Sequence, residues 1–203
     1  MTEPPAGAHL KGQIFLARLE YLRDQHGAQG LQRVLGSLPG EDRDRLSGVD
    51  REAWYPFALL MRLDKTIAGT LAPSDPAIYE RLGAASSRHR TEWLGAHARL
   101  VNVHGFLSRV ADEHRRFHTF GKAAYHRTGF TEGEIAYSEC PETDLVWCSA
   151  SRGYFRGAIE FLTGGPVNVE ENKCQCRNDD ACVFRMRWMG TGSFPIPAGI
   201  RKN

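Results

Sequence analysis

The chain has 203 residues, of which 41% are hydrophobic and 25% charged, and its formal net charge is +2. These values are typical of a globular protein and exclude wholesale disorder. The near-neutral charge argues against a dedicated binder of nucleic acid or of an acidic membrane surface. The longest apolar run, residues 56–61, is far shorter than the ~20 residues that span a bilayer. We therefore expect a cytoplasmic protein without a membrane span.

We expect one domain over residues 9–190, between a disordered leader at 1–8 and a tail at 191–203. Its first part, residues 9–120, is mainly helical by periodicity, after a short strand that starts at His9. Apolar residues at helical spacing predict helices over 16–26, 31–35, 54–71 and 100–120, and a further helix after Ser74-Asp75-Pro76.

The second part, residues 121–190, alternates between period two and helical period. Short strands are expected over 122–127 and 134–138, a helix over 143–162, and a hairpin-like pair of strands over 167–174 and 182–188. This β-β-α-β-β order after a run of helices predicts an α+β fold, with an antiparallel sheet packed against helices.

The cysteines are confined to the second part. All five lie after residue 139, at positions 140, 148, 174, 176 and 182. An odd count in a chain without a secretory signal is a poor disulfide framework. In a reducing compartment such a cluster more often binds a metal or carries out chemistry.

Three elements of the second part each direct a metal-competent side chain inward. Cys148 lies in the middle of an apolar helix face, and Cys182 shares the inward face of its strand with Phe184. Strand alternation turns Glu171 toward the core, where an unpaired carboxylate is costly. Cys174 belongs to the opposite face of a regular strand, so it can join the others only if the strand bends or bulges.

Three thiolates and a carboxylate suit a closed tetrahedral zinc site, because zinc accepts sulfur and oxygen ligands together. The alternative is that some of these cysteines are small core hydrophobes, since free cysteine is among the most buried residue types. Spacing alone leaves both interpretations open.

The motif Cys148-x5-Tyr154-x16-Glu171-x2-Cys174-x7-Cys182-x-Phe184 resembles the signature of the 4-vinyl reductase domain family. It is most similar to the zinc-containing sensory domain of phenol-responsive transcription activators, over about residues 120–190. The resemblance implies zinc held by the Cys, Glu, Cys and Cys of this motif, and a fold shared with subunits of trafficking complexes. The N-terminal half resembles uncharacterised myxobacterial proteins of similar length.

Two features depart from the family pattern. Cys140 and Cys176 are extra thiols, and Cys176 is close enough to Cys174 to replace it as a ligand. The phenol sensors place a His/Trp pair against the bound ring, whereas the equivalent stretches here contain His97 and His126. We therefore expect a ligand other than simple phenol.

The resemblance implies a sensory homodimer whose ligand pocket lies between the sheet and the helices. We expect it to bind a hydrophobic or aromatic ligand without turnover. Candidate pocket residues are His97, Phe106, Phe117, Tyr125, His126 and Trp147, although ordinary core packing is the alternative for each aromatic. Because the chain ends after the sensory unit, we expect a separate effector protein.

Two other functions and one further motif remain open. The family name derives from reduction of a vinyl group on a tetrapyrrole, but no flavin or nicotinamide fingerprint is visible that would supply electrons. The shared fold also allows a protein-interaction scaffold. His114 and His118 are spaced to ligate a metal or face an anionic ligand, and the alternative is a basic, solvated helix face.

Overall fold

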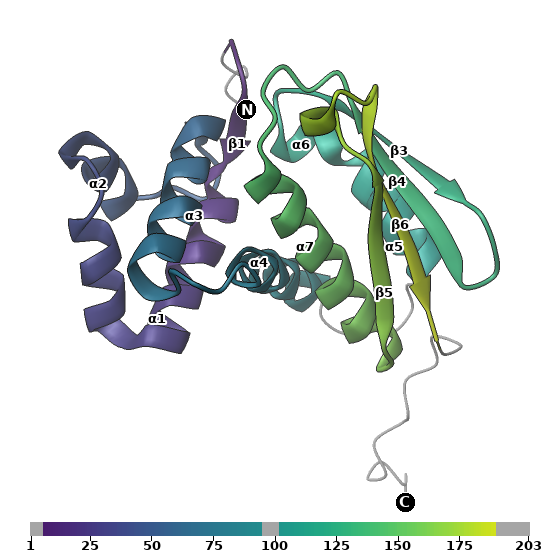
Figure 1. Cartoon of the computed structure of the whole chain (residues 1–203), viewed down its shortest axis with the longest axis horizontal. Helices are drawn as coiled ribbons and strands as arrows, with labels where there is room; N and C mark the ends of the chain where they lie inside the picture. The colour runs from purple at the N-terminus through teal and green to yellow at the C-terminus, as the bar shows by residue number, and fades with distance from the viewer. Residues whose placement is uncertain (1–5, 95–101, 190–203) are drawn as a thin grey trace, which may run out of the picture.

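The structure is a computed structural model that describes residues 6–94 and 102–189, as Figure 1 shows. The predicted tail at 191–203, most of the predicted leader at 1–8, and His97 lie outside these ranges. The last leader residue, Ala8, is buried, and its carbonyl accepts a hydrogen bond from the Phe57 N–H.

The first part of the chain is mainly helical. The predicted strand at His9 pairs with a second short strand, and the two helices predicted within 16–35 form one element bent at Gly27, where φ is 64°. A left-handed φ suits glycine, so the chain turns there without a loop. The elements are β1 (His9–Lys11), α1 (Gly12–Gly36), α2 (Gly40–Ser47), β2 (Trp54–Pro56), α3 (Phe57–Leu71) and α4 (Ile78–Leu94).

The second part contains the main sheet, which is antiparallel with the strand order β3-β4-β6-β5. The helix predicted over 100–120 is broken at Glu113 into two helices. The elements are α5 (Val103–Asp112), α6 (His114–Phe117), β3 (Lys122–Arg127), β4 (Glu132–Ser138), α7 (Leu145–Thr163), β5 (Val167–Lys173), the 3-10 turn η2 (Gln175–Arg177) and β6 (Ala181–Trp188). The α+β class with an antiparallel sheet is confirmed.

Helices α5 and α7 pack on one face of this sheet (Figure 1). The strand residues that face them, such as Ile135, Phe184 and Met186, are buried. The alternating positions carry charge, and the Arg187 guanidinium donates to a carboxylate oxygen of Glu132 at 3.2 Å. The sheet is therefore apolar toward the helices and polar on the other side, as period-two alternation requires.

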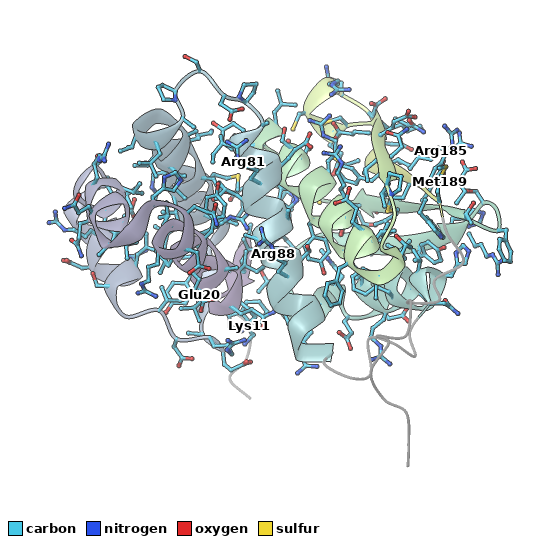
Figure 2. The ribbon with its side chains drawn as sticks, turned by 90° about the horizontal axis from the view of Figure 1, so that it is seen from below. Lys11, Glu20, Arg81, Arg88, Arg185 and Met189 are labelled. Atoms are coloured by element: carbon cyan, nitrogen blue, oxygen red, sulfur yellow. The ribbon has the colours of Figure 1, made fainter. Side chains whose placement is uncertain are left out.

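The two parts are joined where α4 crosses α7, and Figure 2 shows these helices side by side. Their backbones touch at glycines. A Cβ added to Gly153 would lie 1.9 Å from the Glu80 carbonyl oxygen, and one added to Gly83 would lie 1.8 Å from the Ala150 carbonyl oxygen. Any side chain at either position would force the helices apart, so glycine is needed for this close approach.

Each part has its own apolar core. One core is formed by the N-terminal helices with Phe120 and Val146, and the other by the sheet with α5 and α7. Across the described ranges, no helix combines the length and apolarity needed to cross a bilayer.

Candidate functional site

The structure brings the four predicted metal ligands together. Cys148 lies near the start of α7, where the Asp144 carboxylate accepts a hydrogen bond from the Val146 N–H at 2.9 Å. Cys182 lies at the start of β6, directly opposite Tyr137 of β4. The thiols of Cys148 and Cys182, which we expected to point inward, are both buried.

The other two donors come from the end of β5. The register of β5 against β6 shifts between Glu171 and Lys173, so the predicted bulge is present. It brings Cys174, which is fully buried, to the same side as Glu171. The turn after Cys174 is fixed by its N–H, which donates to a carboxylate oxygen of Asp179 at 2.7 Å.

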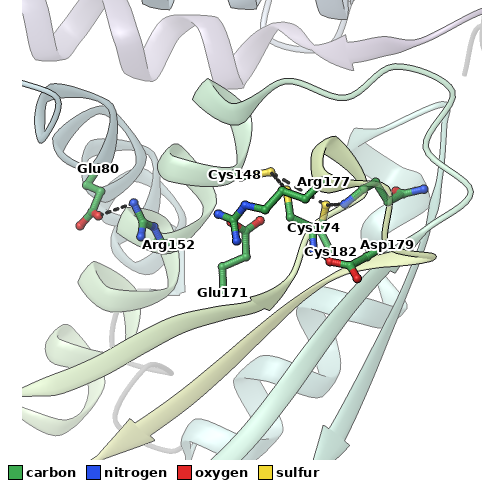
Figure 3. Close-up of polar contacts among 9 residues, drawn as sticks. Glu80, Cys148, Arg152, Glu171, Cys174, Arg177, Asp179 and Cys182 are labelled. Carbon is green, nitrogen blue, oxygen red and sulfur yellow. Dashed lines mark hydrogen bonds and ion pairs between the residues drawn. The ribbon is translucent and has the colours of Figure 1, made fainter.

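The donor atoms converge on one point, as Figure 3 shows for their side chains. The Cys148 sulfur lies 3.6 Å from that of Cys174 and 3.9 Å from that of Cys182. Two sulfurs each about 2.3 Å from a tetrahedral zinc are about 3.8 Å apart, whereas a disulfide requires about 2.05 Å. One donor atom from each of the three cysteines and Glu171 lies within 4.8 Å of all the others.

Glu171 gives an independent sign that the cluster suits a cation. Its side chain is 5% exposed, and its Oε1 atom is buried without a hydrogen-bond partner in the described part of the chain. A buried carboxylate oxygen with no partner is costly. A metal ion among the thiols would satisfy it, so the donor set fits a closed zinc site.

Without a metal, the thiols hold their protons unequally. The hydrogen bond with Cys182, together with burial, raises the pKa of Cys148 far above its usual range. The same hydrogen bond lowers the pKa of Cys182 to about 6, helped by the Gln175 N–H that donates to its sulfur at 3.3 Å. Burial raises the pKa of Cys174 to about 12. One thiolate is thus already formed at neutral pH.

The two extra cysteines lie outside the cluster. Cys140 and Cys176 are both partly buried. Cys174, rather than Cys176, contributes its sulfur to the group of four donors.

A cavity of about 210 Å³ lies where the two parts of the molecule meet. It is lined by α1, α4, α6 and α7 together with Tyr137 of β4 and the segment before β2. Its walls are mostly aromatic or small, and they include Ile14, Ala17, Arg18, Gly83, Ser86, His114, Phe117, His118, Tyr137, Trp147, Ser151, Tyr154 and Phe155.

Two histidines from α6 and its C-terminal end form one wall. The rings of His114 and His118 stack with centroids 4.2 Å apart. His114 Nε2 lies 2.9 Å from the Phe120 carbonyl oxygen, and His118 Nδ1 lies 3.1 Å from the His114 carbonyl oxygen. Because a carbonyl only accepts, both nitrogens must carry hydrogen, which leaves His118 Nε2 as an acceptor when the ring is neutral.

His118 is neutral under ordinary conditions. Burial, and to a lesser extent the neighbouring His114, lowers the pKa of His118 to about 3. Burial also lowers the pKa of His114. The interpretation of this segment as a basic, solvated face was therefore wrong for the two histidines, although Arg115 and Arg116 are exposed.

The polar edges of other rings complete the cavity. The Trp147 ring lies 5.7 Å from that of His118 at 72°, and Tyr137 lies 5.4 Å from His114. Within the described residues, no hydrogen bond is formed by the Trp147 indole N–H, the Tyr137 hydroxyl or His118 Nε2. These groups offer both donors and an acceptor to a ligand.

The cavity also contains a buried ion pair. Arg18 is 2% exposed and donates to both carboxylate oxygens of Asp64, at 3.0 and 3.2 Å, and to the Leu82 carbonyl at 2.8 Å. It also donates to Ser86. Burial raises the pKa of Asp64, against the lowering effect of Arg18. Because Asp64 balances it, Arg18 does not give the cavity a net positive charge.

The predicted pocket residues are only partly brought together. Phe117 and Trp147 line the cavity, Phe106 is buried in the sheet-side core, and His126 is exposed on β3. Tyr125 instead bonds to His104 on α5. His97 lies outside the described ranges.

Sequence reasoning did not assign Tyr137, Ser151, Tyr154 and Phe155 to the cavity. Tyr154 and Phe155 fall on α7, where helical spacing indicated only core packing. The spacing of His114 and His118 was the available signal for their wall, but the surrounding arginines favoured solvent.

Comparison with protein families identifies a 4-vinyl reductase domain over residues 131–187. This range begins at β4, ends in β6 and contains all four metal-ligand candidates. It supports the family resemblance of this segment, while the closeness to phenol-responsive sensors and to myxobacterial proteins remains a prediction. Among curated proteins, no match was found.

Solved structures similar to the whole chain are H-NOX proteins. One from S. oneidensis in its Fe(II)NO ligation state has a TM-score of 0.70 and 13% identity, covering 89% of this chain and 100% of its own. An oxygen-binding H-NOX domain related to soluble guanylate cyclases has a TM-score of 0.68 and 16% identity, covering 96% and 100%. An unliganded Fe(II) H-NOX from K. algicida has a TM-score of 0.65 and 11% identity, covering 92% and 100%.

These neighbours correct the expected fold. We expected the arrangement of the 4-vinyl reductase domain and trafficking-complex subunits, whereas the overall arrangement is that of H-NOX domains. The expectation rested on a motif within residues 120–190. The helices of the first part, which pack against α7 through α4, determine the arrangement of the whole chain, and the motif does not include them.

Haem is named for the H-NOX family in one of these structures. His118 Nε2 could serve as an axial donor, but the described cavity of about 210 Å³ is too small for a porphyrin. Pockets for drug-sized ligands, which are smaller than haem, already take about 300–1,000 Å³. The residues present do not fit haem.

Proposed function

We propose that this chain is a zinc-containing sensory domain that binds a small hydrophobic or aromatic ligand in the cavity without turning it over. Zinc, held by Cys148, Glu171, Cys174 and Cys182, would join α7 to the β5–β6 hairpin. The observation that carries the proposal is the separation of the two sites, since none of these four residues is among the described residues that line the cavity.

This separation favours binding over catalysis by the metal. Four protein donors already complete a tetrahedral zinc site, so the ion would have no open position for a substrate. The metal would stabilise the fold and leave ligand recognition to the cavity. The family match over residues 131–187 and the H-NOX-like fold support a sensory role, because the H-NOX titles name bound oxygen and an Fe(II)NO state for those proteins.

The cavity suggests the ligand's size and charge. An engineered apolar cavity of about 150 Å³ binds benzene, so about 210 Å³ has room for a substituted ring. His118 is neutral and Arg18 is balanced by Asp64, which disfavours a fully charged ligand. Trp147, Tyr137 and His118 present unpartnered polar atoms that could orient one polar group, and Ser151 lies beside them.

The test combines metal analysis with a ligand screen. Protein purified without chelators should contain one zinc per chain. Substituted phenols, fatty acids and tetrapyrroles are then screened by thermal shift, and a true ligand at a hundredfold excess over its Kd should add about 2.7 kcal/mol of stability. Ser151→Leu should abolish the shift by filling the cavity, whereas Ser149→Leu, on the same helix but outside the lining, should retain it.

Each alternative gives a different result. Chemical conversion of a hit in the presence of a reductant would favour the vinyl reductase. A cavity that binds none of the probes would favour the interaction scaffold. A haem-type absorption band after titration would show that the cavity opens to admit a porphyrin, against the proposal.

Assembly belongs to the same proposal. We expect a homodimer that passes its signal to a separate effector protein. Sedimentation at micromolar concentration checks this, and a mass near 22.7 kDa would contradict the dimer.

A further inference from the structure

Glu171 is held from two sides that differ in chemistry. Its Oε2 atom lies 3.2 Å from a guanidinium nitrogen of Arg177. Its Oε1 atom is buried and has no partner within the described ranges. The carboxylate therefore has one oxygen committed to an arginine and one left for the space among the thiols.

Arg177 reaches Glu171 from the turn that follows Cys174. The Arg177 N–H donates to the Cys174 carbonyl at 2.8 Å, and Asn178 then reverses the chain with a left-handed φ of 68°. Figure 3 shows the Arg177 side chain lying beside the Glu171 carboxylate, while Asp179 holds the Cys174 backbone. The segment that supplies one metal-ligand candidate thus also orients another.

This contact differs from an ordinary surface ion pair. Such pairs contribute little because both charges are well solvated. Here the Arg177 side chain is 59% exposed, but that of Glu171 is only 5% exposed. With zinc present, three thiolates and one carboxylate would exceed the metal's charge by two negative units, and a nearby guanidinium would offset part of that excess.

We propose that Arg177 is a positioning residue of the metal site, which keeps Glu171 as a ligand through Oε1 alone. This inference rests on the proposed zinc site. By occupying Oε2, Arg177 prevents the carboxylate from chelating the ion with both oxygens and preserves four-coordinate geometry. Partners that orient a metal ligand in this way are typically worth 10–100-fold in metal affinity.

Lys173 supplies a matched control. It lies two residues from Glu171 and pairs with Asp180 at 3.2 Å, and neither residue is among the four donors. Arg177→Gln and Lys173→Gln remove the same charge from the same hairpin, but only the first frees Glu171. Arg177→Lys keeps the charge while losing the planar, two-pronged donor.

The experiment first measures zinc in the unaltered protein, then zinc affinity by chelator competition and the visible spectrum after cobalt substitution. Arg177→Gln should bind zinc about 10–100-fold more weakly, and its cobalt bands should lose intensity as a second carboxylate oxygen coordinates. Lys173→Gln should match the unaltered protein, and Arg177→Lys should fall between them. The apo forms should unfold alike, because Arg177 is exposed.

Three results would overturn the inference. Equal affinity and equal cobalt spectra for Arg177→Gln and the unaltered protein would show that Arg177 does not position Glu171. Equal losses in Arg177→Gln and Lys173→Gln would reduce the effect to net charge. An unaltered protein that takes up no zinc would remove the proposed site itself, and this result is read before any variant is made.

Discussion

The metal-ligand cluster and the cavity share helix α7 but are built in opposite ways. At the cluster, four donor atoms converge within 4.8 Å and leave a buried carboxylate oxygen without a partner. In the cavity, aromatic rings surround about 210 Å³ of space, and the arginine in its wall is already balanced by Asp64. The cluster thus requires a cation to be stable, whereas the cavity is stable empty and can respond to a ligand.

The two sites also differ in what they join. The cluster links α7 to β5 and β6 within the second part of the chain. The cavity lies between the two parts, and its walls come from residues as distant as Ile14 and Phe155. Trp147 in the cavity wall directly precedes Cys148 in the cluster. Both also border a small void that reaches Cys182, so the sites are close enough to influence each other.

The largest expected effect is at the cluster. Cys182→Ser replaces a thiolate by a poor zinc ligand, so we expect loss of the metal and a fall of more than about 3 kcal/mol in the free energy of unfolding. Metal analysis and urea denaturation measure both. Cys176→Ser is the control, since Cys176 lies outside the cluster, and it should keep its zinc. Full zinc content in Cys182→Ser would contradict the ligand assignment.

The next effect separates the two sites. Gly153→Ala places a Cβ 1.9 Å from the Glu80 carbonyl oxygen, so α4 and α7 must move apart, at a cost of about 2–3 kcal/mol. The cavity lies along this crossing, whereas the cluster does not. We therefore expect ligand binding to weaken and zinc content to persist, measured by thermal shift and metal analysis.

Gly36→Ala is the matched control for this prediction. Gly36 ends α1, and a Cβ there would meet nothing within 4 Å. The substitution should leave stability unchanged or raise it by about 0.5 kcal/mol. If Gly153→Ala behaved in the same way, the close crossing of α4 and α7 would not be what holds the two parts together.

The cluster was predictable because it is local. Its ligands fall between residues 148 and 182, and period-two alternation fixed the inward direction of Glu171 and Cys182. The side on which Cys174 lies depended on a bulge, which the sequence could only state as a condition. The general α+β class followed from the order of the elements, but the H-NOX-like arrangement did not, because the motif lies entirely within the second part.

The cavity was less predictable because tertiary packing assembles it. Its shape depends on how closely α4 approaches α7, which no periodicity reveals. The chain break at Glu113 turns His114 and His118 inward, although the neighbouring arginines suggested a solvated face. Tyr125 looked like a pocket residue by its type, yet β3 directs it to His104 on α5.

A moderate effect should appear as pH dependence from the cavity. Because the pKa of His118 is lowered to about 3, the unfolded chain binds its proton more readily, and stability should fall as the pH drops below about 6.5. Between pH 7 and pH 5 we expect a loss of about 1–2 kcal/mol. Urea denaturation of His118→Gln should show a correspondingly weaker pH dependence, and an unchanged slope would contradict the buried, neutral ring.

The smallest effect distinguishes two tyrosines on neighbouring strands. Tyr125 of β3 donates its hydroxyl hydrogen to His104 Nδ1, because His104 Nε2 must donate to the Phe130 carbonyl at 2.7 Å. Tyr137 of β4 lines the cavity, and its hydroxyl has no partner within the described residues. The same Tyr→Phe change therefore removes a structural contact at one position and a ligand-facing group at the other.

We expect Tyr125→Phe to cost about 0.5–1.5 kcal/mol, the usual net value of one hydrogen bond, and to leave zinc content and ligand affinity unchanged. Tyr137→Phe should leave the free energy of unfolding nearly unchanged, since no internal hydrogen bond is lost, but should alter the Kd of any ligand whose polar group reaches that hydroxyl. Denaturation curves and ligand titrations of the two variants test this together. The opposite pattern would move the ligand site from the α6–α7 cavity to the β3 edge, because Tyr125 rather than Tyr137 would then contact the ligand.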